Sequence, residues 1–305
     1  MSVKSYNQLS ELFRNEEVGK TLDQDSEFTI HRLELVHPKP TKSPTFRANY
    51  YSFVLVKKGS TKYSIDNHVF STRDRTLYFT NPGHLKSFDI SEVTHGFLIT
   101  VSEAYLKENI HEKVFDDFSF LLTEIVPPCH LEETRFSELH NLAEQILSEQ
   151  KNGSILKHKI ISSLFMVFLL KVKEYLLGDA DFKQAYDRDS EIVNQFKKDL
   201  ESKFRNLVAD KSVSKTIPQV QDFAEAQHLN PSYFSTVIKT KTSRTANQWI
   251  QGKICSEAKA LLSNTRDSIK EIAYTLGFHE ATHFSKFFKK YEGVTPGAFR
   301  KAKRD

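Results

Sequence analysis

The segment 268–299 has the pattern of two short helices separated by a glycine. Its first half places apolar side chains at i, i+3, i+4 and i+7, one face of a helix of about two turns, at Ile269, Ile272, Ala273 and Leu276. Gly277 ends this helix, because glycine takes the left-handed conformation of a C-terminal cap without penalty. A second helix is predicted from about Glu280 to Tyr291, with an aromatic face opposite a basic and polar one. This order is typical of a helix-turn-helix unit.

The same pattern occurs about fifty residues upstream. Val220, Phe223, Ala224 and Leu229 correspond to Ile269, Ile272, Ala273 and Phe278. After a one-residue offset, Phe234, Val237, Ile238 and Lys239 correspond to Phe284, Phe287, Phe288 and Lys289, and Thr245 and Trp249 to Thr295 and Phe299. The repeat predicts two recognition helices on one polypeptide.

The segment from about Ile217 to Lys303 resembles the paired helix-turn-helix domain of the AraC/XylS family of transcription regulators. The diagnostic string is I-A-x-x-x-G-F at 272–278 followed by F-S-K-x-F-K-K-x-x-G-x-T-P at 284–296. The upstream copy departs from it, since Ser243 and Ala246 stand where the downstream copy has Gly293 and Pro296. An arginine that the family often carries in the helix joining the units is Ile254 here. The resemblance implies a sequence-specific regulator that binds double-stranded DNA and, if it is an activator, RNA polymerase.

Composition indicates two domains of different character. The 305 residues have 39% hydrophobic and 27% charged side chains, ordinary values for a globular protein. From Arg188 onward there are 21 Lys and Arg against 13 Asp and Glu, and the remainder has 22 against 26. A basic C-terminal part suits contact with phosphate. With only Cys129 and Cys255, and no apolar signal segment in 1–20, we expect a cytoplasmic protein.

The first part of the chain predicts a sheet domain, so that the whole chain is of α+β class. Short strands are expected at 50–56, 62–66, 77–80 and 96–101, with a turn at 81–83. They indicate a small antiparallel barrel or jelly roll. Their order also resembles the cupin-like sensor domain that precedes the DNA-binding domain in many AraC/XylS proteins. The resemblance implies a small-molecule effector.

Helices are predicted to follow at 133–150 and 154–177. The second contains residues 164–170, which are apolar on every side and therefore expected to be buried on every side. This run is too short to span a membrane. Either its own domain covers it, or one face packs on the sensor domain and the other on a second subunit, and we favour the homodimer. The expected divisions are 1–177 for sensing and dimerisation, 178–210 for a linker and connecting helix, and 211–305 for DNA binding.

Outward-facing residues of the two second helices are the candidates for DNA contact. Downstream, we expect Ala281, Thr282, His283 and Lys286 at base edges and Lys289 and Lys290 at phosphates. Upstream, Asn230 caps the helix, Pro231 fits its first position, and the candidates are Ser232, Ser235, Thr236 and Lys239. Small hydroxyl side chains read bases less decisively, so this unit should discriminate less. A stiff helix at about 246–262 would hold the two recognition helices roughly 34 Å apart, in successive major grooves.

Two patterns suggest metal chemistry and are rejected. Residues 279–283 satisfy H-E-x-x-H, but that zinc motif needs both histidines on one helix and a third ligand, and Gly277 breaks the helix just before His279. His68, His84 and His95 lack the H-x-H and glutamate pattern of metal-binding cupins. We therefore expect no metal, no cofactor and no enzymatic activity.

The candidates for effector binding are aromatic side chains of the predicted strands, namely Tyr51, Phe53, Tyr63 and Phe79. The same residues are equally expected as plain core. Two alternatives to an effector-controlled regulator remain. One is a cupin-type ligand-binding protein or enzyme with a helical appendage. The other is a regulator without a ligand, in which the barrel is a structural dimerisation module.

Overall fold

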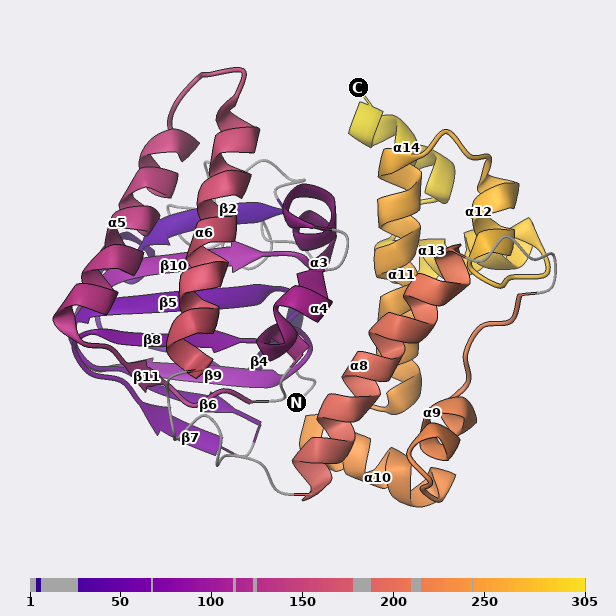
Figure 1. Ribbon diagram of the computed structural model, residues 1–305, viewed down its shortest axis with the longest axis horizontal. Coiled ribbons are helices and arrows are strands. Elements are labelled where there is room, and N and C mark those ends of the chain that lie inside the picture. Colours follow the sequence, from indigo (N-terminus) through magenta and orange to yellow (C-terminus); the bar gives the residue numbers. More distant parts are fainter. Residues whose placement is uncertain are drawn as a thin grey trace. The chain divides into compact units, whose positions relative to one another are not determined.

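The computed structural model describes residues 4–6, 27–66, 68–111, 114–122, 125–177, 188–209, 215–242 and 244–304 (Figure 1). The chain divides into two compact units, an N-terminal unit Met1–Ser190 and a C-terminal unit Glu191–Asp305. Of the linker and connecting helix expected at 178–210, residues 178–187 and 210 lie outside the described residues, and the connecting helix is α8 (Arg188–Ala209).

The strands of the N-terminal unit form two sheets. The first has the order β11-β8-β5-β10-β2 and is antiparallel throughout, with β2 (Phe28–Arg32), β5 (Tyr51–Lys58), β8 (Thr76–Thr80), β10 (His95–Val101) and β11 (Cys129–His130). The second has the order β1-β4-β9-β6-β7 with β3 also on β9, comprising β1 (Lys4–Tyr6), β3 (Thr41–Lys42), β4 (Phe46–Ala48), β6 (Lys62–Ile65), β7 (His68–Ser71) and β9 (Leu85–Ile90). Of the two expected forms, barrel or jelly roll, the arrangement is jelly-roll-like and not a closed barrel, because the strand pairings stay within two separate sheets.

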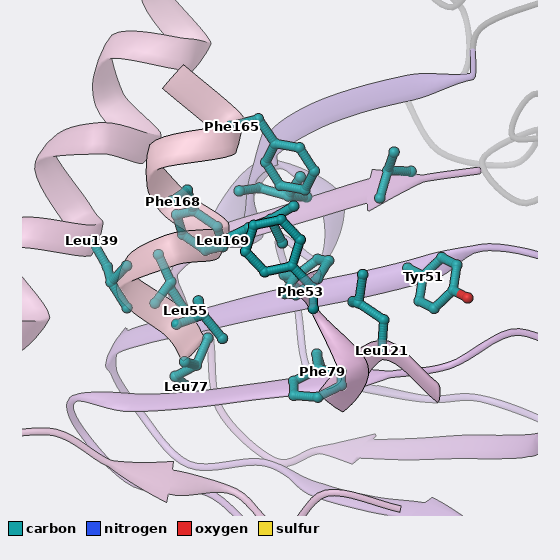
Figure 2. Close-up of a cluster of buried hydrophobic side chains, with 14 of the residues drawn as sticks. Tyr51, Phe53, Leu55, Leu77, Phe79, Leu121, Leu139, Phe165, Phe168 and Leu169 are labelled. Atoms are coloured by element: carbon teal, nitrogen blue, oxygen red, sulfur yellow. The ribbon is translucent and has the colours of Figure 1, made fainter. Parts of the chain in front are cut away.

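Two long helices cover one face of the first sheet, α5 (Glu133–Gln150) and α6 (Lys157–Leu177) (Figure 1). Since side chains alternate along a strand, β5 turns Phe53 and Leu55 to these helices. Phe53 makes edge-on contacts with Phe165 and Phe168 of α6 at 5.8 Å between ring centroids (Figure 2). The main core of this unit therefore lies between sheet and helices.

Helix α6 is buried on one face only, contrary to the expectation from its apolar run. Phe165, Phe168 and Leu169 are fully buried, whereas Val167 is 43% and Leu170 52% exposed. No helix among the described residues is both long and apolar enough to cross a membrane. The described part of the unit also contains short helical segments, namely α2 (Leu33–Val36), α3 (Glu103–Tyr105), η2 (Leu106–Ile110), α4 (Val114–Asp117) and η3 (Ser119–Leu122).

The described part of the C-terminal unit is all-helical. It comprises α8, α9 (Val220–Ala226), α10 (Pro231–Thr242), α11 (Ala246–Asn264), α12 (Ile269–Thr275), α13 (Ala281–Glu292) and α14 (Pro296–Arg304). Helix α11 contributes to two cores. Its first half, with Ile250 and Ile254, packs with α8, α9 and α10, and its second half, with Ala258 and Leu262, packs with α12 and α13. Each helix pair of the sequence repeat thus has its own core.

Helix α8 contacts α9 and α10 through aromatic side chains and α11 through an ion pair. Phe196 and Phe204 of α8 are fully buried, and Phe196 packs edge-on against Phe223 and Phe234. The Lys253 ammonium, on α11, is buried and forms ion pairs with Glu201 on α8 and with Glu257 one turn further along α11. Breaking a buried pair leaves an uncompensated charge, so these contacts fix α8 to the rest of the unit.

Candidate functional site

Helices α12 and α13, which we call the downstream motif, meet at a tight turn built on Gly277. Ser268 and Glu271 form a reciprocal capping box that begins α12, and the hydrogen bonds from Ser268 hold the pKa of Glu271 below its usual value. Gly277 has φ +85°, and a Cβ there would lie 2.8 Å from the Ile217 nitrogen. The turn therefore requires glycine for its conformation and for the close approach of a second chain segment.

Helices α9 and α10, the upstream motif, repeat this geometry. In both turns the backbone N–H donates to a carbonyl five residues earlier at 2.9 Å, Leu229 to Ala224 and Phe278 to Ala273. The residue equivalent to Gly277 is His228, which adopts φ +55°. Asn230 then accepts from the Ser232 nitrogen at 2.9 Å and begins α10, as expected.

The candidates on α13 largely face solvent. Thr282, His283, Lys286, Lys289 and Lys290 are exposed, on the side opposite the buried Phe284 and Phe288. Ala281 is the exception. It is half-buried and packs against the core of the downstream motif, so its methyl group is less available to a base.

Glu280 is a further member of this surface that the sequence interpretation passed over. Its carboxylate accepts a hydrogen bond from the Thr282 hydroxyl at 3.0 Å and lies 3.8 Å from Nε2 of His283. It also occupies the N-cap position of α13. A carboxylate at the start of a recognition helix can accept from the amino group of cytosine. Its position at the start of the helix could have identified it as a candidate from the sequence.

On α10 the candidates are less uniformly exposed to solvent. Ser232, Thr236 and Lys239 are exposed, but Ser235 is half-buried, and the Thr236 hydroxyl donates to the Ser232 carbonyl at 2.9 Å. Tyr233 is 43% exposed at the start of the helix and was not among the candidates. The fifty-residue offset that relates the motifs places Tyr233 where α13 has His283. The repeat could therefore have identified Tyr233 as a DNA-contact candidate from the sequence.

The two recognition helices differ in charge. Exposed lysines occur on α13 at 286, 289 and 290, and Lys286 corresponds to the uncharged Thr236 of α10. Phosphate contact supplies most non-specific affinity for DNA. The recognition helix of the downstream motif therefore presents the larger positive charge to solvent.

The residues of the H-E-x-x-H string do not share a helix. Glu280 is the N-cap of α13, so His279 precedes the helix and only His283 lies within it. This geometry removes the one-turn spacing that zinc proteases use. Among the three histidines of the N-terminal sheets, Nδ1 of the fully buried His84 is 2.6 Å from Asp66, whereas Nδ1 of His95 is 3.8 Å from Glu34, and the exposed His68 stacks on Phe70.

A cavity of about 290 Å³ in the N-terminal unit is the candidate effector site. Of the four aromatic candidates, Tyr63 lines it. Tyr51, Phe53 and Phe79 belong instead to the core under α5 and α6, on the opposite face of the first sheet (Figure 2). The assignment of these three residues to the cavity is corrected accordingly, because alternation along β5 and β8 turns Val54 and Tyr78 into the cavity in their place.

Comparisons with known proteins agree with the repeat. Residues 223–302 match the family model described as a helix-turn-helix domain. The Msm operon regulatory protein of Streptococcus mutans is 25% identical over 268 residues, which are 85% of this chain and 86% of that protein. The melibiose operon regulatory protein of Escherichia coli is 35% identical over 82 residues, which are 27% of each chain.

A structure of ToxT from Vibrio cholerae aligns with 90% of this chain and 97% of its own, at 14% identity and a TM-score of 0.35. The higher identity, to the melibiose operon regulatory protein, covers only 82 residues, whereas the lower identity to the Msm operon regulatory protein covers 268 residues and so extends across both units.

Proposed function

We propose that this chain is a DNA-binding regulator of transcription of the AraC/XylS type, in which α10 and α13 read successive major grooves of one site. The observation that supports this is the repeated turn, which leaves one polar face of each recognition helix exposed over a separate core. Helix α11 has 19 residues and is therefore about 28 Å long, close to one turn of duplex.

Within this proposal the residues divide by role. Thr282, His283 and Lys286, with Glu280, contact bases downstream, and Ser232, Tyr233 and Thr236 do so upstream. Lys239, Lys289 and Lys290 contact phosphates, which position the protein without specifying sequence. Ser235 and Ala281 are half-buried and lie at the edge of the DNA-contacting surface, where they support the neighbouring contact residues.

The remaining parts of the proposal concern control. The sensing and dimerisation part is 1–177 and the DNA-binding part 211–305. Binding of an effector in the cavity, or of a second copy of the chain, changes how the DNA-binding parts are presented to DNA. If the protein is an activator, it also contacts RNA polymerase. Cys129 and Cys255 are buried and form no disulfide with each other, which suits the cytoplasm. We expect no enzymatic activity.

A homodimer is part of this proposal because α6 and the residue before it present an apolar stripe to solvent. Leu156, Ile160, Val167 and Leu170 are exposed by 53%, 37%, 43% and 52%. With the exposed Ser163 they follow spacings of four and three residues, the seam of a coiled coil. Pairing of this stripe with a second copy would remove it from water.

The test is selection of bound sequences from random duplex DNA. We expect an enriched motif with two half-elements about one helical turn apart. Lys286→Ala and Thr282→Ala should relax the preference in one half-element, whereas Lys151→Ala, an exposed lysine of the N-terminal unit, should leave it unchanged. Salt-sensitive binding without any enriched motif would refute sequence-specific reading.

A further inference from the structure

The cavity of the N-terminal unit has a predominantly apolar wall. It is lined by residues of both sheets, including Val54 and Val56 of β5, Leu98 of β10, and Phe88 and Ile90 of β9. Its volume of about 290 Å³ suits one small molecule. Such a wall favours a ligand that is apolar along most of its length.

Polar groups also line the cavity, among them Ser, Thr and Tyr hydroxyls and the exposed Lys42, and three of the polar groups bear directly on ligand binding. Lys86 is 7% exposed, and its ammonium donates to the Thr80 hydroxyl at 2.8 Å. The Tyr63 hydroxyl and Nδ1 of His37 are buried, and neither has a hydrogen-bond partner among the described residues. Buried polar atoms are almost always paired, so both atoms need an explanation. A ligand atom that accepts or donates in the cavity would supply the missing partner.

The strand register orders these groups. In the antiparallel pair of β6 and β9, Tyr63 lies opposite Phe88 and Ile65 opposite Lys86. Alternation puts Lys86, Phe88 and Ile90 on the same face of β9, over roughly 13 Å. The His37 ring packs on Phe88 at 4.8 Å between centroids. Along β9 the cavity wall thus runs from the cationic Lys86 past the aromatic Phe88 to the apolar Ile90.

We propose that this cavity binds a small monocarboxylic acid with an apolar tail, its carboxylate at the Lys86 ammonium and its tail along Phe88 toward Ile90. A charge-assisted hydrogen bond in a site largely removed from water is stronger than a neutral one. The inference deepens the effector role in the proposed function and rests on it for biological meaning, although binding itself requires no DNA.

A sugar fits the same cavity less well. Each hydroxyl of a buried sugar needs a partner, and an unpaired one is costly. The described residues that line the cavity include no Asp, Glu, Asn, Gln or Arg, the side chains that can meet two hydroxyls at once. The Ser, Thr and Tyr hydroxyls of the lining each carry a single donor, whereas Lys86 is a buried cation, so the lining favours a ligand with one anionic head.

The test is calorimetric titration of the full chain with sodium octanoate, 1-octanol and melibiose. We expect octanoate to bind at least about ten-fold more tightly than octanol, and melibiose to give no binding. Lys86→Met should weaken octanoate at least about ten-fold and leave octanol nearly unchanged, because only the charged partner is lost. Lys58→Met, at an exposed site on β5, should change neither. Tyr63→Phe, which keeps the ring in place, should weaken octanoate by a few-fold.

Several outcomes would overturn the proposal. They are equal affinity for octanoate and octanol, an unchanged octanoate affinity in both Lys86→Met and Tyr63→Phe, binding of melibiose in preference to octanoate, and the absence of binding by all three probes. Selection of DNA by the ligand-free protein is a separate measurement. If the protein binds octanoate but enriches no DNA motif, the proposed regulatory function is refuted and the carboxylate site stands. If it enriches a motif but binds no octanoate, only the carboxylate site is refuted.

Discussion

Gly277 and Gly293 both have positive φ, +85° and +79°, but their surroundings differ. A Cβ at Gly277 would meet the backbone of Thr216 and Ile217 at 2.9 and 2.8 Å, whereas at Gly293 nothing lies within 4 Å. Gly293→Ala should therefore cost only the left-handed conformation, about 1 kcal/mol, and Gly277→Ala about 3 kcal/mol, since the overlap adds to it.

Urea unfolding followed by Trp249 fluorescence measures this difference, because Trp249 is the single tryptophan and lies in the C-terminal unit. Equal losses of unfolding free energy in the two variants would show that the approach of residues 216 and 217 does not constrain the turn.

Two partly buried histidines of the N-terminal unit predict a pH dependence. Burial lowers the pKa of both His31 and His37 from 6.5 to about 4. Between these values the unfolded chain binds more protons than the folded one. Stability should therefore be complete above about pH 6.5 and fall as the pH is lowered toward 4, by up to about 1.4 kcal/mol per pH unit for each histidine.

Thermal unfolding by circular dichroism between pH 7 and 4.5 measures the effect. The double variant His31→Gln/His37→Gln should lose stability less steeply on acidification than the wild type, and His68→Gln, at an exposed site, should follow the wild type. Parallel curves for the double variant and the wild type would contradict the assignment.

Equivalent positions on the two recognition helices should read different half-elements of the DNA site. Tyr233 on α10 and His283 on α13 are related by the fifty-residue offset and are both exposed. Tyr233→Ala should relax the selected sequence in one half-element and His283→Ala in the other, each by about 1–3 kcal/mol of discrimination. Selection from random DNA with each variant measures this. Loss of preference in the same half-element by both variants would mean that the two helices do not read separate grooves.

The helices of the C-terminal unit were predictable because each keeps a 3.6-residue apolar period and ends at a cap. The cavity was not. Phe53 and Val54 are neighbouring apolar residues on β5, and alternation places their side chains on opposite faces of the sheet. The sequence does not show which of these faces the helices cover and which lines the cavity. Lys86 and His37 carried no signal, because a charged side chain on a strand normally indicates the solvent face. Glu280 and Tyr233 could have been found from the start of α13 and from the repeat.

At the scale of the molecule, the exposed stripe of α6 predicts the oligomeric state. The double variant Val167→Glu/Leu170→Glu places two charges where an apolar seam would close, and desolvating them should weaken self-association at least about 100-fold. The matched control His158→Glu/Lys159→Glu adds the same acidic groups to exposed positions of the same helix outside the stripe. Sedimentation equilibrium should give the chain mass of 35.2 kDa for the first variant and twice that mass for the control and the wild type.

The same variants separate dimerisation from DNA reading. Each chain carries both recognition helices, so a monomer should still bind one pair of half-elements with unchanged sequence preference. What it should lose is cooperative binding to two such pairs on one DNA fragment, because linked sites gain affinity only while the chains are joined. Cooperative binding that survives in a variant shown to be monomeric would place the contact between chains outside α6. Loss of binding to a single pair would mean instead that the monomer cannot present its two helices unaided.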